Sequence, residues 1–476
     1  MIRSNLPEPV VIELTPAPEA AAVFERCAGL PRLVYFDSSL RDGMRGRYSY
    51  LAADPFCWLE RTPRDAPLES WRKKGAGWHA MRKEELPPWQ GGVAGLLGYE
   101  LGRTIERLPA TQWDEFGLPV LALGWYDWVV AFDHQADRAW IVSQGLPETG
   151  DARLRRAAER AAWVHQLICG GLSPDCKVAR EITPLARDRL APCFERPNAE
   201  GLWSNFSREG YLAAVERVIE HLRAGDAFQV NLSQRLLTQD QGDPVGSYLR
   251  LRKRNPAPFA GYLDGGSWQI ASASPERFLH VTDRVVETRP IKGTRPRGAT
   301  PAEDERLGIE LVTSEKERAE NVMIVDLLRN DLARVAEDAS VEVPLLFSLE
   351  RYEHVQHLVS AVTARLRPEA DLIDLVTAAF PGGSITGAPK VRAQEIITSL
   401  EPTARGAYCG TLLWTGYPDE RGNEPMDSNI LIRTLTHARG WVQAPVGGGV
   451  TVRSEPEAEY QETWHKAAGL LDAGRR

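Results

Sequence analysis

Short apolar runs separated by turn-rich polar stretches dominate the first part of the chain. The runs LVYF, VLALGWYDWVVAF and RAWIVSQ, at residues 33–36, 120–132 and 138–144, are rich in the aromatic and β-branched residues that favour strands. After them, residues 151–168 combine small and charged side chains in a pattern that predicts a helix. We therefore expect a group of strands followed by one helix.

The rest of the chain alternates groups of predicted strands with predicted helices. Apolar residues recur at helical spacing from Leu212 to Leu222 and predict a helix over about 208–224. Further strands are predicted at 226–238, 268–272, 278–287, 408–417, 428–436 and 441–444, and further helices at 303–334, 371–379, 388–399 and 455–472. Strands in groups with helices between the groups are typical of an α+β fold rather than of βαβ repeats.

Tryptophans and glycine-rich segments divide the chain. Nine of the fourteen tryptophans lie before residue 170, whereas the glycine-rich segments lie after residue 225. A polar stretch with four prolines, residues 173–201, separates them. We therefore expect an N-terminal region (1–172), a connecting stretch (173–205) and a C-terminal region (206–474).

Charge and cysteine usage narrow the class of protein. The 476 residues include 57 Lys and Arg against 65 Asp and Glu, and this net charge of −8 disfavours nucleic acid and anionic membranes as partners. No apolar run approaches the roughly 18–20 residues that cross a bilayer, and the first residues lack the apolar run of a secretory signal. Six scattered cysteines without a CxxC pair argue against a disulfide framework. We expect a cytoplasmic protein.

Two of the predicted helices each carry a pair of glutamates one turn apart. Glu317 and Glu320 share a face that continues into apolar residues, and Glu459 and Glu462 repeat this spacing. Carboxylates on an apolar face need a compensating partner, and oxygen ligands without nearby His or Cys favour Mg²⁺. The alternative is that these faces turn toward solvent, with Glu462 in an ordinary surface pair with Lys466.

Two glycine-rich segments and one lysine are further candidates. PGGSITGAPK has the glycine spacing of a P-loop, but Ala388-Pro389 stands where a nucleotide site needs Lys-Ser/Thr. VGGGV, residues 446–450, either presents backbone N–H groups to an anion or forms a tight turn. Lys292 follows Glu276 by sixteen residues across a predicted hairpin, and it is either solvated or a nucleophile facing a buried site.

Together these segments resemble the chorismate-utilising enzymes, which include anthranilate synthase component I, aminodeoxychorismate synthase component I, isochorismate synthase and salicylate synthase. The motifs run in order through residues 226–468 and are GDAFQVNLSQR, SPERFL, PIKGT, AENVMIVDLLRNDL, HVQHLVS, FPGGSITGAPKVRAQEI, YCGTLLW, ILIRT and GGGVTVRSEPEAEYQETWHKA. The resemblance implies an α+β fold with two antiparallel sheets packed near-orthogonally and helices outside. It also implies that both regions contribute strands.

Two positions discriminate within this family. Salicylate and isochorismate synthases carry a water-activating lysine in the GDAF motif where this chain has Gln229, so the resemblance implies ammonia as the nucleophile. PIKGT, with Lys292, is typical of aminodeoxychorismate synthases, whereas anthranilate synthases have PIAGT. In the former, the lysine attacks C2 of chorismate as the 4-hydroxyl leaves, and ammonia then adds at C4. The resemblance is therefore closest to the large subunit of the enzymes that serve 4-aminobenzoate and folate biosynthesis.

Two alternatives stay open. The first is anthranilate synthase component I with an atypical lysine. The second is a non-catalytic binding protein of the same fold, which the intact set of acids, bases and carboxylate-gripping residues disfavours.

The resemblance also implies roles for single residues. Glu276 corresponds to the general acid that protonates the departing hydroxyl, and His357 to a histidine that orients substrate near C4. Tyr408 and Arg433 correspond to the residues that grip the enolpyruvyl carboxylate. The other residues that the resemblance implies in substrate binding are Gln229, Thr386, Lys466 and the backbone amides of Gly447, Gly448 and Gly449.

The implied cofactor is Mg²⁺, bound by Glu320 and Glu462, with Glu317 and Glu459 holding metal-bound waters. No cysteine lies in a GxCxGxQ elbow, so the implied partner is a glutamine amidotransferase subunit that supplies ammonia. Some relatives hold tryptophan near the segment that corresponds to YFDSSLRDG, residues 35–43. This segment departs from the LLES pattern of anthranilate synthases, which puts feedback inhibition in doubt.

Overall fold

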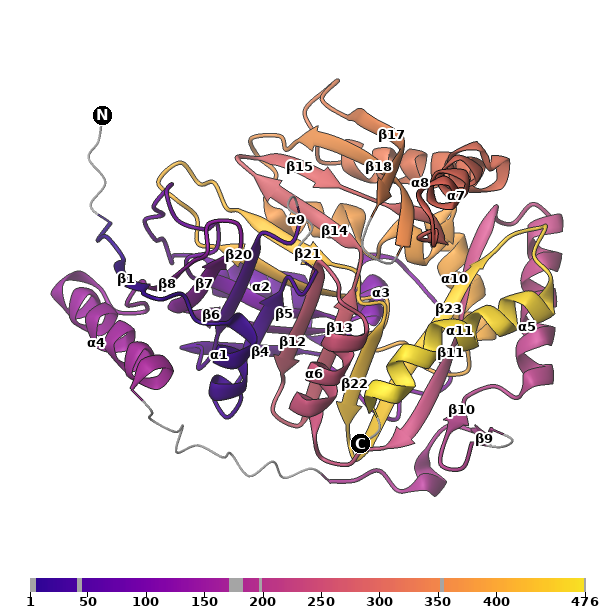
Figure 1. Cartoon of the computed structure of the whole chain (residues 1–476), viewed down its shortest axis with the longest axis horizontal. Helices are drawn as coiled ribbons and strands as arrows, with labels where there is room; N and C mark the ends of the chain where they lie inside the picture. The colour runs from indigo at the N-terminus through magenta and orange to yellow at the C-terminus, as the bar shows by residue number, and fades with distance from the viewer. Residues whose placement is uncertain (1–5, 41–44, 171–182, 197–198, 352–354, 475–476) are drawn as a thin grey trace.

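A computed structural model of the chain describes residues 6–40, 45–170, 183–196, 199–351 and 355–474. These residues form two large antiparallel β-sheets with helices around them (Figure 1). The predicted α+β fold with two antiparallel sheets is therefore confirmed. Part of the connecting stretch, including residues 173–182, and residues 41–43 of the segment at 35–43 lie outside the described residues.

The larger sheet draws its strands from both ends of the sequence. Its described strands are β1 (Val10–Leu14), β2 (Val34–Asp37), β3 (Tyr48–Ala52), β7 (Trp128–Asp133), β8 (Arg138–Ser143), β9 (Phe194–Glu195), β10 (Trp203–Ser204), β11 (Gln229–Gln239), β12 (Phe259–Asp264), β13 (Trp268–Ser274), β19 (Gly387–Ala388), β22 (Thr434–Ala438) and β23 (Trp441–Val450). They lie in the order β1-β8-β7-β3-β2-β12-β13-β22-β23-β11-β10-β9, and β19 also pairs with β11. Tyr35 of β2 lies opposite Tyr262 of β12, so the N-terminal and C-terminal regions join in the middle of this sheet.

The second sheet is built in the same way. Its described strands are β4 (Cys57–Arg61), β5 (Gly92–Leu97), β6 (Leu121–Tyr126), β14 (Arg277–Thr282), β15 (Val285–Thr288), β16 (Ile291–Pro296), β17 (Glu342–Arg351), β18 (Val355–Arg365), β20 (Thr411–Gly416) and β21 (Met426–Asn429). They lie in the order β16-β18-β15-β14-β21-β20-β5-β6-β4, and β17 pairs with β18. Pairing of β20 with β5 joins the two regions of the sequence.

Helices cover the outer faces of the sheets. The described helices are α1 (Ala20–Cys27), α2 (Pro67–Gly75), α3 (Gly102–Ile105), α4 (Gly150–Cys169), α5 (Arg208–Arg223), α6 (Pro244–Arg254), α7 (Pro301–Thr313), α8 (Glu315–Ala333), α9 (Leu372–Ala379), α10 (Lys390–Leu400) and α11 (Pro456–Gly474), with short 3₁₀ turns η1 (Pro63–Asp65), η2 (Tyr99–Leu101), η3 (Arg187–Arg189) and η4 (Gly383–Ile385). In Figure 1, α6 and α11 cross in front of the larger sheet, on which they pack against β13 and β23. The predicted helices at 151–168, 208–224, 371–379, 388–399 and 455–472 are thus confirmed to within a few residues.

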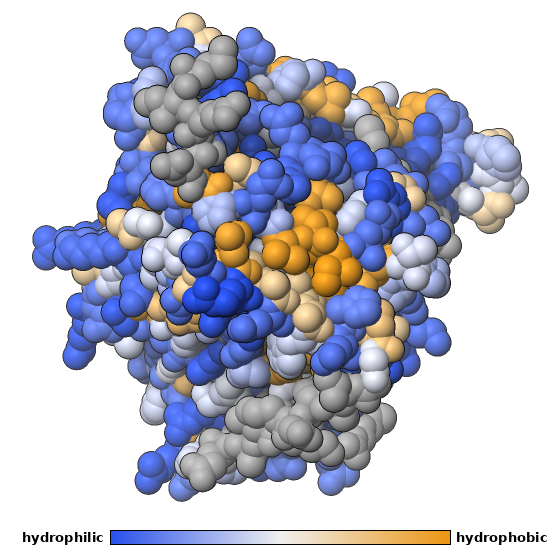
Figure 2. Space-filling view, turned by 90° about the vertical axis from the view of Figure 1, so that its left-hand side faces the viewer, coloured by the Kyte–Doolittle hydropathy of each residue, from blue (hydrophilic) through white to orange (hydrophobic). Residues whose placement is uncertain are grey.

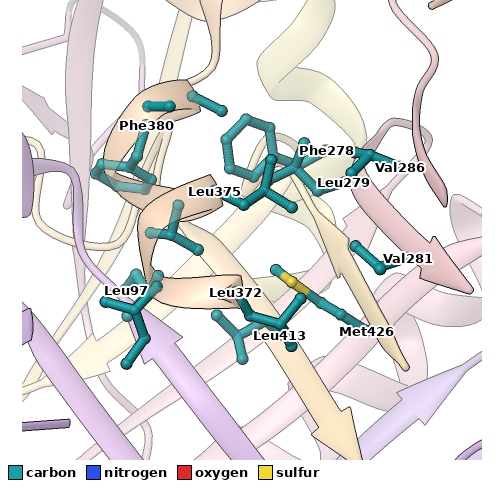
Figure 3. Close-up of a cluster of buried hydrophobic side chains, with 14 of the residues drawn as sticks. Leu97, Phe278, Leu279, Val281, Val286, Leu372, Leu375, Phe380, Leu413 and Met426 are labelled. Carbon is teal, nitrogen blue, oxygen red and sulfur yellow. The ribbon is translucent and has the colours of Figure 1, made fainter. Parts of the chain in front are cut away.

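Apolar side chains fill the spaces between these layers. The space between the sheets holds Trp89 and Trp414, whose rings stack with centroids 6.0 Å apart. On the outer face of the second sheet, Leu375 of α9 and Phe380, the residue after α9, pack with Phe278 of β14 (Figure 3). Burial of such side chains is the main stabilising contribution to the fold.

The exterior is mostly polar on the face that carries α4 and β1. Figure 2 shows this face as largely hydrophilic, with a group of apolar residues near its centre. Within the described ranges, no helix combines the length and the apolar character that crossing a membrane requires. The five cysteines of the described residues are free, as the scattered spacing predicted.

Several predicted elements are wrong in detail. The single helix predicted at 303–334 is two helices, because Ser314 ends α7 and its side chain caps α8. The strand predicted at 278–287 is the hairpin β14–β15, and that at 428–436 is two strands in different sheets. The alternative of a tight turn at 446–450 is also wrong, since these residues continue β23. The elements that were not predicted include the helices α1, α2, α3 and α6 and the strands β1, β3, β4, β5, β12, β17 and β18.

Candidate active site

The hairpin β14–β15 brings Glu276 and Lys292 together. Glu276 immediately precedes β14, and Lys292 lies on β16, shortly after β15. Glu276 is only 5% exposed, and this burial raises the pKa of its carboxyl to about 7, although hydrogen bonding from Ser384 and the charge of Lys292 oppose the rise. A carboxyl with this pKa is protonated often enough at neutral pH to serve as a general acid.

Lys292 lies near the acidic side chains of Glu276 and of Glu320 on α8. Its side chain is half-buried, and desolvation lowers the pKa of its ammonium even though the carboxylates of Glu320 and Glu276 favour the charged form. Lys466 lowers it further by charge repulsion. The same surroundings therefore favour a neutral amine on Lys292 and a neutral carboxyl on Glu276.

The glutamates of α11 gather around Gly448 of β23. A Cβ added at Gly448 would lie 3.2 Å from Glu459 Oε2, 3.5 Å from Glu462 Oε1 and 3.6 Å from Lys466 Nζ. The Lys466 ammonium donates to Glu462 Oε1 at 2.6 Å and to the carbonyl of Gly447 at 2.8 Å. Glycine at position 448 thus leaves room for two acids and a lysine against the strand.

The glutamates of α8 face the same region from the other side. Burial raises the pKa of Glu320, and the nearby carboxylates of Glu317 and Glu462 add to this rise. The charges of Lys292 and Lys316 oppose it. The Oε1 atom of Glu320 is buried without a hydrogen-bond partner, which is costly for a carboxylate unless a cation binds it.

We call Glu317, Glu320, Glu459 and Glu462 the acidic cluster. Their carboxylates are the kind of ligand that Mg²⁺ prefers, but the four side chains lie too far apart to form a compact metal site. All four residues of the predicted metal site are glutamates, Glu320 Oε1 has no hydrogen-bond partner, and Glu462 is close enough to Glu320 to raise its pKa. Among the described residues, no three His, Cys, Asp or Glu side chains are close enough together to hold a metal ion. The charges of Lys292 and Lys316 act to lower the pKa of Glu320, and those of Lys466 and Lys316 act to lower the pKa of Glu462. Magnesium binding by these residues therefore stays a prediction.

The glycines of β23 present backbone groups to an open edge. Asn231 lies opposite Gly449 and donates its amide to the Thr386 carbonyl at 2.8 Å, on the side away from β23. In an antiparallel pair this geometry turns the amide of Gly449 away from β11, and the amide of Gly447, two residues earlier, faces the same way. In the described residues β22 covers that side of β23 only from Trp441 to Gln443. Of the three predicted amides, Gly448 is the one directed toward β11.

The side chain of Gln229 lies against Gly449 of β23 and is fully buried. Both side-chain amide atoms lack a hydrogen-bond partner, and a Cβ at Gly449 would lie 2.5 Å from its Nε2. Two unsatisfied polar atoms in one buried side chain are unusual and are expected where a ligand completes them. An amide also cannot act as a base at neutral pH.

Arg433 lies beside α11, and Tyr408 lies close enough to Arg433 to influence the pKa of its guanidinium. Arg433 has a positive φ of 53°, and its Nη1 donates to the carbonyl of Lys466 at 3.1 Å. Burial lowers the pKa of its guanidinium, while Tyr408 and Glu462 act in the opposite direction. Tyr408 is only 4% exposed and neutral, since burial raises its pKa. The structure therefore places Arg433 next to the acidic side chains of α11, with Tyr408 near Arg433.

The side chains of His357 and Thr386 form hydrogen bonds with residues close to them in the fold. His357 on β18 shares a hydrogen bond with Thr294 of β16 at 2.9 Å, and burial lowers the pKa of its imidazole to about 4. It is therefore neutral near pH 7. Thr386 is fully buried, and its hydroxyl donates to the Gly382 carbonyl at 3.0 Å, so that hydroxyl is used within its own loop.

Sequence reasoning missed two groups at this site. Ser384 in η4 donates to Glu276 Oε1 at 2.7 Å, although the sequence indicated only a glycine-rich loop there. Arg405, 5% exposed, pairs with Glu401 at 2.7 Å and lies 5.8 Å from the ring centre of Tyr408. The contact of Ser384 has no local signal, because Glu276 is 108 residues away. Glu401 and Arg405 have i,i+4 spacing, but they follow the end of α10 and are not on a helix.

A separate cavity of about 320 Å³ opens between the two regions of the sequence. Asp37 and Ser38 of the segment at 35–43 line it, together with Arg45, Phe259 and Trp414. None of the predicted catalytic or metal-binding residues is among its lining residues. The structure therefore separates the segment that corresponds to the tryptophan site of some relatives from the site around Lys292.

Comparison with known proteins defines the class of this site. The family model described as chorismate binding enzyme matches residues 39–472, so the chain belongs to this family of chorismate-utilising enzymes. Aminodeoxychorismate synthase component 1 of Escherichia coli is 39% identical over 480 residues, which cover 97% of this chain and 98% of that protein. Anthranilate synthase component 1 of Thermus thermophilus is 41% identical over 393 residues, which cover 82% of this chain and 79% of that protein.

Solved structures agree with the fold. The chain is similar to the crystal structure of anthranilate synthase component I from Streptococcus pneumoniae, with a TM-score of 0.72 and 29% identity over 90% of this chain and 93% of that one. It also shares the fold of MenF, the isochorismate synthase of Escherichia coli, with a TM-score of 0.70 at 16% identity over 99% of this chain and 95% of that one. The predicted resemblance to the anthranilate synthase component I fold is confirmed.

Proposed function

We propose that this protein is the large subunit of an aminodeoxychorismate synthase, which converts chorismate and ammonia to 4-amino-4-deoxychorismate and water. The observation that carries the proposal is the pairing of Lys292, whose ammonium pKa is lowered, with Glu276, whose carboxyl pKa is raised to about 7. A neutral amine beside a neutral acid is the combination that nucleophilic attack with loss of a hydroxyl requires. Relatives named aminodeoxychorismate synthase component 1 support it.

In the first half of the proposed reaction, the neutral Nζ of Lys292 bonds to C2 of chorismate. The ring double bonds shift, the bond from C4 to its hydroxyl oxygen breaks, and the proton of Glu276 leaves with that oxygen as water. The secondary ammonium formed on Lys292 loses one proton to solvent. Glu276 is then a carboxylate.

In the second half, ammonia bonds to C4, the double bonds shift back, and the bond from C2 to Lys292 breaks. The proton released by the new ammonium group returns to Glu276, directly or through water, and the departing lysine nitrogen takes up a proton from solvent. The enzyme therefore returns to its starting state. Because the amide of Gln229 cannot act as a base, water is not activated at C2, which favours ammonia over water.

Magnesium would be held by Glu320 and Glu462, and Glu317 and Glu459 would bind its waters. When bound, it would neutralise the ring carboxylate of chorismate and polarise the ring. Arg433, Tyr408 and Lys466, with the outward amides of Gly447 and Gly449, would bind the enolpyruvyl carboxylate.

We further propose that ammonia comes from a glutamine amidotransferase subunit and that the reaction serves 4-aminobenzoate and folate biosynthesis in the cytoplasm. The names of the relatives as component 1 support a second component. Anthranilate synthase component I is the second candidate, because relatives of that name are as similar as 41% identical.

Product identification distinguishes the two candidates. The protein is incubated with chorismate, Mg²⁺ and ammonium, and the products are separated with and without an added aminodeoxychorismate lyase. We expect 4-aminobenzoate to form only when the lyase is present. Fluorescent anthranilate as the main product without the lyase would contradict the proposal and support the second candidate.

A further inference from the structure

Among the described residues, one side chain, that of Ser384, donates a hydrogen bond to the carboxyl of Glu276, and the charge of Lys292 and the backbone amide of Ile291 also favour the carboxylate. The hydroxyl of Ser384 donates to Glu276 Oε1 at 2.7 Å across a sequence separation of 108 residues. The backbone of Glu276 is also fixed, because its carbonyl accepts the amide of Ile430 at 3.0 Å and its amide donates to the Ser274 hydroxyl at 3.2 Å. Ser384 therefore acts on a residue whose main chain is already in place.

The turn that carries Ser384 is braced by several elements. A Cβ at Gly383 would lie 2.5 Å from Leu327 Cδ2, so the turn packs closely against α8. The Ile385 carbonyl accepts the side-chain amide of Asn231 at 3.0 Å and Arg405 Nη1 at 3.2 Å. Thr386 closes the turn through its hydroxyl bond to Gly382. A hydroxyl on such a turn has a fixed position relative to Glu276.

This hydrogen bond determines which oxygen of Glu276 can carry the proton. A protonated carboxyl has one O–H, and its other oxygen is the better acceptor. Since Oε1 accepts the hydroxyl hydrogen of Ser384, the acidic proton belongs on Oε2. A general acid must hold its proton within hydrogen-bond reach of the leaving oxygen to be effective.

We propose that Ser384 is a positioning residue that fixes the general acid Glu276 with its proton on Oε2, directed at the departing 4-hydroxyl. The proposal rests on the proposed function for the identity of the leaving group. Ser384 itself does not exchange a proton with the substrate. Its role is distinct from that of Thr386, whose hydroxyl holds the turn rather than the acid.

The charged and titratable groups around Glu276 define how its titration should respond. Lys292 faces it, and the thiol of Cys409 is close but neutral, since burial raises its pKa to about 12. The neighbouring Arg277 is directed to Asp427 at 2.9 Å and to Glu287 at 3.5 Å. Donation from Ser384 stabilises the carboxylate, so loss of the hydroxyl should raise the pKa of Glu276. Activity that needs the protonated acid should then persist to higher pH.

The variants Ser384→Thr and Ser384→Val provide the test, because they have nearly the same shape and differ in the hydroxyl. We expect Ser384→Val to lower kcat roughly 10- to 100-fold with KM for chorismate changed less than about threefold. The limb of the pH profile that Glu276 sets, near pH 7 in the wild type, should move up by about one pH unit. Ser384→Thr should retain most of kcat and the wild-type limb.

A buried serine elsewhere provides the matched control. Ser204 on β10 is 5% exposed and donates to Gln234 at 2.7 Å, so Ser204→Val removes a comparable hydrogen bond away from Glu276. In Ser204→Val, the limb of the pH profile that Glu276 sets should stay at the wild-type pH. Equal kcat and an equal limb for Ser384→Thr and Ser384→Val would overturn the positioning role. A limb shift confined to Ser384→Val in an enzyme that releases anthranilate would support the role of Ser384 and overturn only the proposed product.

Discussion

Burial shifts the protonation of Lys292 and Glu276 in opposite directions. It lowers the pKa of the lysine and raises that of the glutamate to about 7, because a low-polarity environment disfavours both charged forms. Each side chain also stabilises the charged form of the other, which limits the shifts. The two groups are coupled, so a pH profile reports on the pair rather than on either residue alone.

The pH dependence of kcat should reveal this pair. Below the pKa of Lys292 the amine is protonated and cannot attack, and above that of Glu276 the carboxylate has no proton to donate. We expect a bell-shaped profile with one limb near pH 7 that is set by Glu276, and the variant Glu276→Gln should lose that limb together with roughly 10²- to 10⁴-fold in kcat. A limb near pH 7 that is unchanged in Glu276→Gln would assign that limb to another group.

At the scale of elements, β23 and the helices α8 and α11 form the site together. Strand β23 runs past β11 with three glycines, and their missing side chains leave space for Gln229 on one side and for the acids of α11 on the other. The i and i+3 spacing of the glutamates indicated that each pair shares a helix face, and both pairs do face the cluster. The sequence could not show that glycines of a strand separate them, because this depends on register.

Replacing Gly449 should damage both packing and activity. A Cβ there would lie 2.5 Å from Gln229 Nε2 and 2.9 Å from its Cδ, and Gln229 is fully buried. We expect Gly449→Ala to lower the free energy of unfolding by about 1–3 kcal/mol and to reduce kcat/KM. Denaturant unfolding and kinetics measure this. Gly75→Ala is the control, since nothing lies within 4 Å of a Cβ at Gly75, and stability loss equal to that of Gly449→Ala would contradict a local clash.

Removing one carboxylate charge should weaken magnesium binding while leaving the fold intact. We expect Glu320→Gln or Glu462→Gln to raise the Kd for Mg²⁺ at least about tenfold, measured by calorimetry as well as by activity. The matched variant Glu457→Gln on the exposed side of α11 should bind Mg²⁺ as the wild type does. Normal Mg²⁺ affinity and turnover in Glu462→Gln would exclude the four-carboxylate site.

At the scale of the whole molecule, the two regions of the sequence form one structure. Several of the longer elements could be predicted from local patterns, such as α5 and β11, whereas the single apolar run at 120–132 becomes two strands in different sheets. The order of strands could not, because β2 pairs with β12 and β5 with β20 across more than two hundred residues. The break at Ser314 had a local signal that was missed, because Ser314 and Glu317 have the spacing of a helix N-terminal cap. The contact of Ser384 with Glu276 had no such signal, because its partner lies 108 residues away.

The C-terminal region alone should therefore fail to fold. A fragment of residues 206–474 would leave β12 and β20 without their partners β2 and β5 and would expose the apolar face that packs on Trp89. We expect no cooperative thermal transition by circular dichroism, because unpaired strand edges and exposed apolar surface cost more than the remaining contacts contribute. A sharp transition like that of the full chain would show that the region is an independent domain.

The most direct test of the account is the product formed by Lys292→Ala. With chorismate, Mg²⁺ and ammonium, the wild type and the control Lys73→Ala, a substitution on exposed α2, should both make 4-amino-4-deoxychorismate at similar rates. Lys292→Ala should lose at least about 10³-fold in this rate, because the covalent route through Lys292 is removed while the acid and the carboxylate cluster remain. In the wild type without ammonia, intact-protein mass spectrometry should show an adduct of chorismate minus water that Lys292→Ala lacks. Unchanged formation of 4-amino-4-deoxychorismate by Lys292→Ala would contradict the central claim that this lysine is the nucleophile.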